Sequence, residues 1–152
     1  MPISFSDVSD PDGWEQIDFK QDDPNSRWID GGFLATAPID VPATLNGGVW
    51  ASTKVEAAFG MRGRRVAANF TVPTRHHNLR QLMVVTSGEM TVAYGGKGET
   101  QRVAAGEFWI GEAETPYSMT AGAEGVTYIE CYPESMSIVE TVWHDDPNWV
   151  RR

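Results

Sequence analysis

The chain has 152 residues, with 12 basic and 21 acidic side chains and a formal net charge of −9. This balance argues against nucleic acid and anionic membranes as partners, because both need clustered lysine and arginine. Hydrophobic residues make up 41% of the chain, which excludes a wholly disordered protein. A chain of this length is expected to bury one core, so we predict a single domain.

Cysteine usage and the N-terminal sequence indicate a compartment. No apolar run approaches the roughly 18 residues of a membrane-spanning helix. The first residues, MPISFSDVSDPDGW, lack the basic region and apolar stretch of a secretion signal. Cys131 is the only cysteine, so no internal disulfide can form. We therefore expect a cytoplasmic protein.

The predicted elements follow in chain order. Residues 1–26 are polar, acidic and interrupted by proline and glycine, so we expect an irregular N-terminal arm there. Beyond it, short runs rich in β-branched and aromatic residues alternate with turn residues about every eight to twelve positions. These runs predict strands over 28–37, 48–58, 64–72, 79–86, 89–94, 100–104, 107–111, 116–121, 125–132 and 136–142. The segment 27–143 is then the folded body, and 144–152 is a C-terminal tail.

Turns, not helices, join the predicted strands. The clearest hairpin signal is the Gly95-Gly96-Lys97-Gly98 stretch, because glycine adopts positive φ at little cost. Many short strands without crossover helices are typical of an antiparallel sandwich or a closed barrel. The sequence therefore predicts an all-β protein. We expect its lining or core to contain Met83, Met90, Phe108, Ile110 and Met119, and expect a turn with surface cations at Arg62, Arg64 and Arg65.

Two of the three histidines, His76 and His77, are adjacent in the stretch TRHHNLRQ. Side chains of a strand alternate between its two faces, so both rings cannot enter a barrel from extended backbone. His77 shares its face with Arg75 and Gln81, whereas His76 shares the other face with Asn78. Only one of the two histidines is therefore expected to face inward.

The spacing of these residues resembles the cupin superfamily. The first family motif, Gly-x5-His-x-His-x3-Glu-x6-Gly, often with Gln for Glu, matches the spacing Arg75-x-His77-x3-Gln81-x6-Gly88. The second, Gly-x5-Pro-x-Gly-x2-His-x3-Asn, matches Gly106-x5-Glu112-x-Glu114-x2-Tyr117. The stretches VTSGEMTV, which resembles the family's hairpin, AAGEFWIG and TPYS are also similar to the family. The resemblance covers about residues 60–132 and implies a single-domain cupin-type antiparallel β-barrel, or jelly roll, that forms a homodimer.

In that family four side chains converge on a divalent metal, and their positions fall on Arg75, His77, Gln81 and Tyr117. Arg75 has a fixed positive charge and no lone pair to donate, and Tyr117 must lose a proton of pKa near 10 to become a ligand. The remaining two ligands are fewer than the three protein groups that usually hold a catalytic metal. One alternative stays open: a bulge could turn His76 inward, so that His76, His77 and Gln81 hold one Fe, Mn, Ni or Zn ion, with Tyr117 as a fourth partner.

Without a metal, the same cluster suits proton transfer. His77 has an unperturbed pKa near neutrality and can act as acid or base. Tyr117 can donate a proton to a developing oxyanion, Arg75 can hold a carboxylate or enolate, and Gln81 can orient the substrate or His77. We therefore predict a small enzyme of lyase or isomerase type that acts by proton transfer, dehydration or cyclisation on a small carbonyl or carboxylate compound inside the barrel.

Alternatives to this function remain open. The protein could be a metal-dependent cupin such as a dioxygenase, or a non-catalytic small-molecule binding protein. Arg75 could also be neutralised by a carboxylate such as Glu130, which would make the cluster purely structural. In the strand 125–132 either the face with Tyr128, Glu130 and Tyr132 or the opposite face could line the cavity. The methionine-rich lining fits an aromatic ligand, and Arg75 fits a carboxylate.

Overall fold

The computed structural model describes residues 11–16, 45, 47–51, 55–56, 59–95 and 98–144 of the chain. These ranges contain two 3-10 helices, η1 (Pro11–Gly13) and η2 (Met136–Ile138), and no helix long and apolar enough to cross a membrane. Their strands are β1 (Glu15–Gln16), β2 (Val49–Ala51), β3 (Val55–Glu56), β4 (Gly60–Val66), β5 (Thr71–His77), β6 (Gln81–Tyr94), β7 (Glu99–Ala104), β8 (Phe108–Gly111), β9 (Tyr117–Tyr132) and β10 (Thr141–Trp143).

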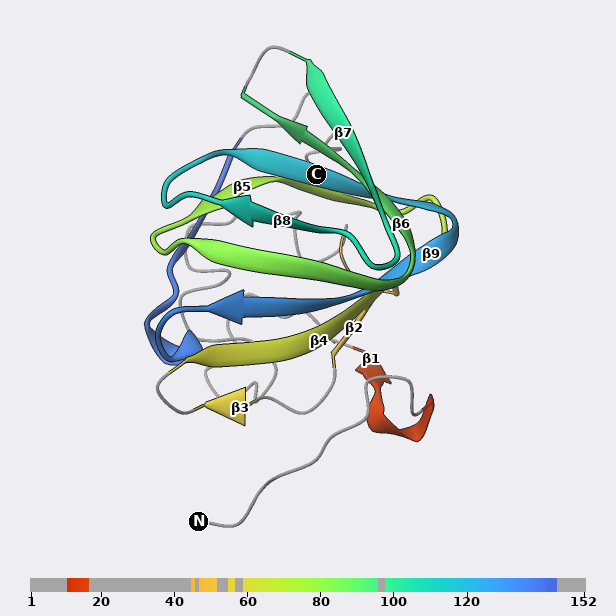
Figure 1. Ribbon diagram of the computed structural model, residues 1–152, viewed down its shortest axis with the longest axis horizontal. Coiled ribbons are helices and arrows are strands. Elements are labelled where there is room, and N and C mark those ends of the chain that lie inside the picture. The colour runs from red at the N-terminus through yellow and green to blue at the C-terminus, as the bar shows by residue number, and fades with distance from the viewer. Residues whose placement is uncertain are drawn as a thin grey trace, which may run out of the picture.

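The strands form one antiparallel sheet that curls into two layers, and β6 and β9 run through both (Figure 1). The first part of β6 pairs with β8 and with the last part of β9, and β4, β2 and β1 continue this layer. The second part of β6 pairs with β7 and with the first part of β9, and β5 and β10 continue the other layer. This confirms the predicted all-β class and the antiparallel barrel or jelly-roll arrangement.

The two long strands bend together at glycines. The register between β6 and β9 shifts on both sides of Gly88, where Gly88 has a φ of 70° and Gly125 a φ of 79°. A Cβ atom at Gly88 would collide with the backbone carbonyl of Gly125, so glycine lets the strands approach at the bend. The sequence predicts separate strands over 79–86 and 89–94. They are one strand, β6, because the pairing with β9 continues through the bend, and β9 likewise joins two predicted strands.

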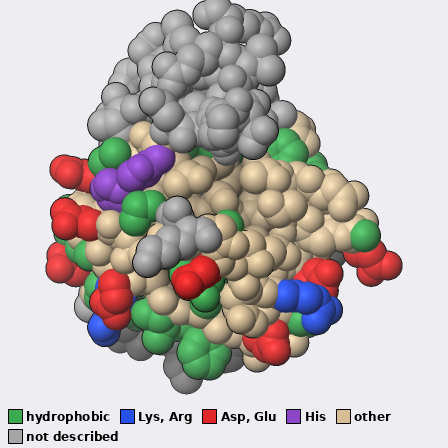
Figure 2. All heavy atoms as spheres, turned by 90° about the horizontal axis from the view of Figure 1, so that it is seen from above, with side chains coloured by type: hydrophobic (Ala, Val, Ile, Leu, Met, Phe, Trp, Pro, Cys, Tyr) green, Lys and Arg blue, Asp and Glu red, His purple; other side chains and the backbone are tan. Residues whose placement is uncertain are grey.

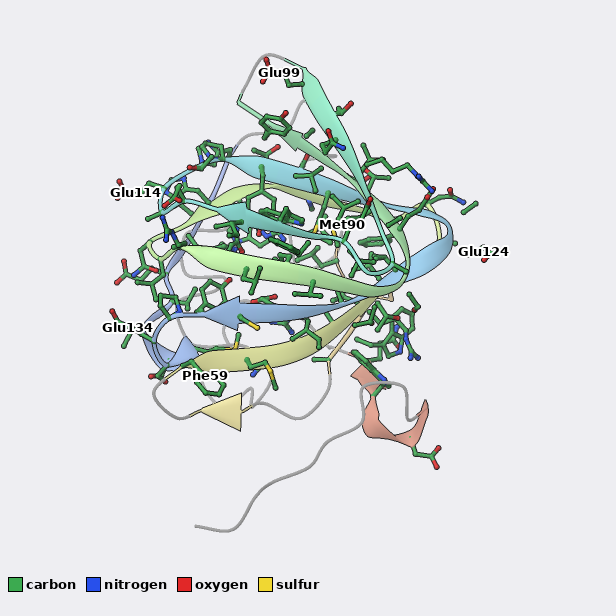
Figure 3. The ribbon with its side chains drawn as sticks, in the orientation of Figure 1. Phe59, Met90, Glu99, Glu114, Glu124 and Glu134 are labelled. Atoms are coloured by element: carbon green, nitrogen blue, oxygen red, sulfur yellow. The ribbon has the colours of Figure 1, made fainter. Side chains whose placement is uncertain are left out.

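The core lies between the two layers. Met83, Met90 and Met119 are at most 1% exposed, and Figure 3 shows Met90 pointing between the layers, while the labelled glutamates lie at the periphery. Unbranched methionine side chains fill irregular gaps between valines and tyrosines of the facing strands. Phe108 and Ile110 are not part of this core, in contrast to the prediction: they are 63% and 55% exposed.

Several strand boundaries differ from the predicted ones. The predicted strand 64–72 is wrong, because β4 ends at Val66 and a turn over 67–70 precedes β5. Asn69 takes a φ of 59° in this turn, a conformation that asparagine tolerates better than most residues. The predicted strand 136–142 is a 3-10 helix followed by the shorter strand β10.

Other predicted elements agree with the structure or lie outside its described part. Tyr94 pairs with Glu99 across the glycine-rich turn, so the predicted hairpin is confirmed. The strand predicted over 28–37 lies outside the described residues, as does most of the 1–26 arm and most of the tail. Within the arm, β1 pairs with β2.

Candidate functional site

Strand β5 places Arg75 and His77 inside the barrel and His76 outside it. Arg75 and His77 are each 4% exposed, whereas His76 is half-buried. His77 lies opposite Thr141 of β10, and Arg75 lies opposite Tyr117 of β9. The register shift of β5 against β9 comes before Arg75 and not at His76. His76 therefore keeps the outward direction that strand alternation predicts.

A buried chain of hydrogen bonds runs through His77. Its Nδ1 atom lies 2.9 Å from the Thr141 hydroxyl, and its Nε2 atom lies 3.1 Å from the Tyr117 hydroxyl. Tyr117 donates to Oε1 of Gln81 at 3.2 Å, and Tyr132 donates to the same oxygen at 3.4 Å. All of these residues are at most 4% exposed. The fold thus brings His77, Tyr117 and Gln81 together, from three different strands.

The geometry of this hydrogen-bonded chain indicates which atom carries each proton. Tyr117 has a single hydroxyl proton, and its donation to Gln81 leaves the oxygen to accept from Nε2–H of His77. His77 is then neutral, and its Nδ1 atom accepts from the Thr141 hydroxyl. The reverse arrangement, in which Tyr117 donates to His77, loses the bond between Tyr117 and Gln81. Every bond of the chain is satisfied only with the proton on Nε2.

Burial keeps both His77 and Tyr117 uncharged. Desolvation, followed by the positive charge of Arg75, lowers the pKa of His77 to about 3. Desolvation raises the pKa of Tyr117 above its usual value, while Arg75 acts in the opposite direction because a cation stabilises the phenolate. At pH 7 the imidazolium form of His77 is present in only about one molecule in ten thousand. The neutral ring can accept a proton, but it is not an acid at this pH, because its one ring proton stays on Nε2.

Arg75, the fourth predicted site residue, packs against Tyr117. Its guanidinium carbon lies 4.6 Å from the centroid of the Tyr117 ring and 5.6 Å from that of Trp143. Its Nη1 atom donates to the Pro73 carbonyl at 3.1 Å, and Nη2 lies 3.7 Å from Sδ of Met119. Among the described residues no carboxylate pairs with Arg75, and its Nε atom makes no hydrogen bond. Arg75 therefore brings a positive charge to the face of Tyr117, with no neutralising anion among the residues that the structure describes.

Glu130, the carboxylate considered as a partner for Arg75, is bound by Arg64 instead. The Arg64 Nε atom donates to Oε2 of Glu130 at 3.2 Å. Burial alone would raise the pKa of Glu130, but the nearby Arg64 and other cations lower it below its usual value. The face with Tyr128, Glu130 and Tyr132 is therefore the inward face of β9.

Sequence reasoning missed several inward residues of this cluster. The prediction of surface cations at 62–65 is wrong for Arg62 and Arg64, which are 1% and 8% exposed. The alternation of β4 with buried Val66 at its end was a signal that could have placed Arg64 inside. Thr141 gave no such signal, because it meets His77 only through the pairing of β10 with β5.

A pocket of about 320 Å³ lies beside the hydrogen-bonded chain, where β7 and β8 leave β6. Its wall is mainly apolar and includes Val92, Val103, Trp109 and Tyr117. The Trp109 and Tyr117 rings meet edge to face, with centroids 4.9 Å apart. Tyr117 thus belongs both to the wall of this pocket and to the buried chain.

The structure does not bring His76 to the other two possible metal ligands, His77 and Gln81. Nδ1 of His76 lies 2.7 Å from Nε2 of His144, which follows β10; Figure 2 shows histidine side chains at the surface, with acidic side chains nearby. His77 and Gln81 are both bonded to the Tyr117 hydroxyl. In the described part of the chain no three His, Cys, Asp or Glu side chains are placed to hold a metal ion. The donors at the barrel positions therefore do not fit a divalent metal.

The solved structures that are similar to this chain include those of the following three proteins. Oxalate decarboxylase from Bacillus subtilis matches 63% of this chain and 28% of its own, with a TM-score of 0.55 and 18% identity. KdgF from Halomonas sp. matches 58% of this chain and 82% of its own, with a TM-score of 0.52 and 14% identity. The DMSP lyase DddQ from Ruegeria pomeroyi DSS-3 matches 56% of this chain and 42% of its own, with a TM-score of 0.50 and 12% identity.

These likenesses concern the fold. The chain spans less than a third of the oxalate decarboxylase chains that it matches. No protein-family model matches the sequence, and no curated protein matches it significantly. A fold hosts many chemistries, so any activity has to be argued from the site.

Proposed function

Since the chain has the cupin fold, we propose that it is a small enzyme of lyase or isomerase type that moves a proton on a small carbonyl or carboxylate compound. The observation that carries this proposal is the position of Tyr117, which lines the pocket and is hydrogen-bonded to His77 and Gln81. The similar structures include a decarboxylase and a lyase, so proteins with this fold can carry out such chemistry.

Tyr117 acts as the proton donor in this proposal. When negative charge develops on a substrate oxygen placed against its hydroxyl, the phenol proton moves to that oxygen. The phenolate that remains lies under the Arg75 guanidinium, 4.6 Å from the ring centroid, and accepts from Nε2–H of His77. Both contacts stabilise the charged ring more than the neutral one, so they favour the transition state over the resting state.

His77 supplies the basic half of the chemistry through Tyr117. In the other tautomer of His77, with the ring proton on Nδ1 and donated to Thr141, the free Nε2 atom can accept the Tyr117 proton, and the phenolate can then remove a proton from carbon. In the empty site this transfer is unfavourable, because burial opens a gap between the two pKa values: it lowers that of His77 to about 3 and raises that of Tyr117 above its usual value. A carboxylate on the substrate would raise the pKa of His77 and reduce that gap. The site therefore favours an anionic substrate.

Hydrogen bonds with Gln81 and Thr141 hold Tyr117 and His77 in place. Gln81 fixes the direction of the Tyr117 hydroxyl and with it the resting tautomer of His77, and Thr141 holds the His77 ring through Nδ1. Both residues act through their neighbours, so we assign them positioning roles. The apolar pocket wall with Trp109 is suited to the remainder of a small, partly aromatic substrate.

The test begins with a panel of small carbonyl and carboxylate compounds, screened for binding and then for turnover. Tyr117→Phe is expected to lower turnover by about 10² to 10⁴, the usual contribution of a positioned acid. Tyr128→Phe is the matched control: it removes a hydroxyl from the same face of β9, and Tyr128 makes no hydrogen bond within the described ranges. Equal turnover in wild type and Tyr117→Phe would refute the proposal. A compound that binds tightly and is returned unchanged would indicate a binding protein instead.

A further inference from the structure

His76 and His144 form a pair on the outer face of the barrel, apart from the buried chain of His77. His76 lies on β5 opposite Val142 of β10, and His144 directly follows β10, where its backbone N–H donates to the Thr74 carbonyl at 2.9 Å. The two histidines are thus diagonal neighbours on paired strands, with their side chains on the same face. Strand pairing therefore brings together two imidazole rings from residues that are 68 positions apart.

The two rings meet nitrogen to nitrogen at the surface. Nδ1 of His76 lies 2.7 Å from Nε2 of His144, and the ring centroids are 4.9 Å apart. Both residues are half-buried, and Figure 2 shows histidine side chains (purple) at the surface. Within the described ranges neither ring forms an ion pair with a carboxylate. A dissolved ion can therefore reach the two facing nitrogens without opening the barrel.

The pair has the chemistry of a metal site. In the hydrogen bond between two neutral rings, one facing nitrogen carries a proton and the other a lone pair. When each ring instead keeps its proton on the outer nitrogen, Nε2 of His76 and Nδ1 of His144, both facing nitrogens present lone pairs, and no proton has to be released. Neutral imidazole is the commonest side-chain ligand of metal ions. Two such ligands at one point of the surface favour a late transition metal over a hard cation such as Mg²⁺.

The separation of the nitrogens favours one coordination geometry. With metal–nitrogen bonds of about 2.0 to 2.1 Å, two ligands at a right angle lie about 2.9 Å apart, and two tetrahedral ligands about 3.3 Å apart. The observed 2.7 Å is nearer to the first value, so a small tilt of the half-exposed rings is enough. Right-angled, tetragonal coordination by nitrogen and oxygen is typical of Cu²⁺ and Ni²⁺, and imidazole suits both ions.

The surroundings of the pair attract cations. Glu140, which is exposed, precedes Val142 and His144 at alternate positions, and its backbone N–H bonds to the Asn78 side chain at 2.8 Å. Strand alternation places these three residues on the same face, and no lysine or arginine occupies an outward position of β5 or β10. The sequence adds two aspartates directly after His144, and the whole chain has a net charge of −9. The local charge therefore favours a bound cation.

We propose that His76 and His144 bind one divalent transition-metal ion, Cu²⁺ or Ni²⁺, on the outer face of β5 and β10, with water at its remaining positions. This site is separate from the barrel interior and does not depend on the chemistry of Tyr117. The ion ties β10, which ends the strand order of its layer, to β5. Because β10 carries Thr141, which bonds to His77, the ion also secures the strand that positions the buried ring.

Isothermal titration calorimetry of the untagged full chain with Ni²⁺ at pH 7.5 tests the site. We expect one ion per chain, and at least about tenfold weaker binding in His76→Ala and in His144→Ala, since even the loss of a residue that only supports a ligand costs that much. Val142→Ala, on the same face, and His77→Gln, inside the barrel, are the controls and should bind as the wild type does. Wild-type affinity in either of the two alanine variants at His76 and His144 would overturn the proposal. So would a wild type without saturable binding up to about 1 mM Ni²⁺, or binding that only His77→Gln abolishes.

Two measurements on the wild type complete the test without relying on a variant to fold. Electron paramagnetic resonance of the Cu²⁺ complex is expected to show coupling to two imidazole nitrogens; a spectrum of thiolate ligation, which would place the ion at Cys131, or one without nitrogen coupling would overturn the proposal. In urea, free Ni²⁺ at a hundred times its dissociation constant is expected to lower the unfolding equilibrium constant about a hundredfold. An unchanged constant would show that the ion does not bridge β5 and β10, and would also overturn the proposal.

Discussion

Lowering the pH from 7 to 4 is expected to destabilise the fold through one buried ring, that of His77. Its pKa is about 3 in the folded protein and near 6.5 in an unfolded chain. Because the folded pKa is the lower one, the unfolded chain binds the extra proton first. The contribution of His77 to stability is therefore complete above pH 6.5 and is lost as the pH falls towards 3. Between pH 7 and pH 4 this linkage amounts to about 3 kcal/mol.

Urea unfolding at pH 7, 5.5 and 4 measures this loss in the wild type and in His77→Gln. Glutamine does not titrate, and its amide can still bond to Tyr117 and Thr141. Carboxylates such as Glu130 titrate in both proteins, so their effect cancels in the comparison. The wild type is expected to lose about 3 kcal/mol more than the variant. Equal losses would refute the reasoning.

Nuclear magnetic resonance of the wild type checks the same point without a substitution. The chain has three histidines, so the imidazole signals can be assigned individually. The His77 signals should move by no more than about a tenth of a full titration shift between pH 8 and pH 4, because a ring with a pKa of about 3 stays mostly neutral there. A midpoint near pH 6.5 for His77 would show that the ring is accessible to protons, and the electrostatic description of the site would then be wrong.

Three further substitutions test the packing around the site by urea or thermal unfolding. Thr141→Val removes the donor to Nδ1 of His77 and should cost about 1 to 3 kcal/mol; a change below roughly 0.5 kcal/mol would contradict the hydrogen-bonded chain. Glu130→Gln leaves the buried charge of Arg64 without its anion and should cost about 3 to 5 kcal/mol, so unchanged stability would place this pair in solvent. Gly88→Ala forces a side chain onto left-handed backbone at the bend and should cost roughly 1 to 3 kcal/mol from strain alone; an unaltered melting temperature would contradict the bend.

Strand alternation predicted the part of the site that depends on local geometry. It places His77, Arg75 and Gln81 on one face and His76 on the other, and the structure has this arrangement. The same rule did not find Thr141, because the contact with His77 arises between residues 64 positions apart. Pairings over such distances depend on which strands become neighbours, and no local pattern encodes that choice.

The fold class followed from the sequence more readily than the strand boundaries did. Glycine-rich stretches mark a change of direction, but they do not distinguish a hairpin from a bend inside one strand. The Gly95–Gly98 stretch is a hairpin, whereas Gly88 is a bend. In β8 every residue from Phe108 to Ile110 is apolar, so alternation could not show that Trp109 faces inward and its two neighbours outward.

The measurement that tests proton transfer at Tyr117 most directly is exchange of a carbon-bound hydrogen for deuterium. A carbonyl or carboxylate compound that binds the pocket is incubated in heavy water with wild type, Tyr117→Phe or Tyr128→Phe, and the exchange is followed by nuclear magnetic resonance. We predict exchange at the carbon next to the carbonyl in wild type and in Tyr128→Phe, and a loss of at least about a hundredfold in Tyr117→Phe. Exchange that continues at the wild-type rate in Tyr117→Phe would contradict the account.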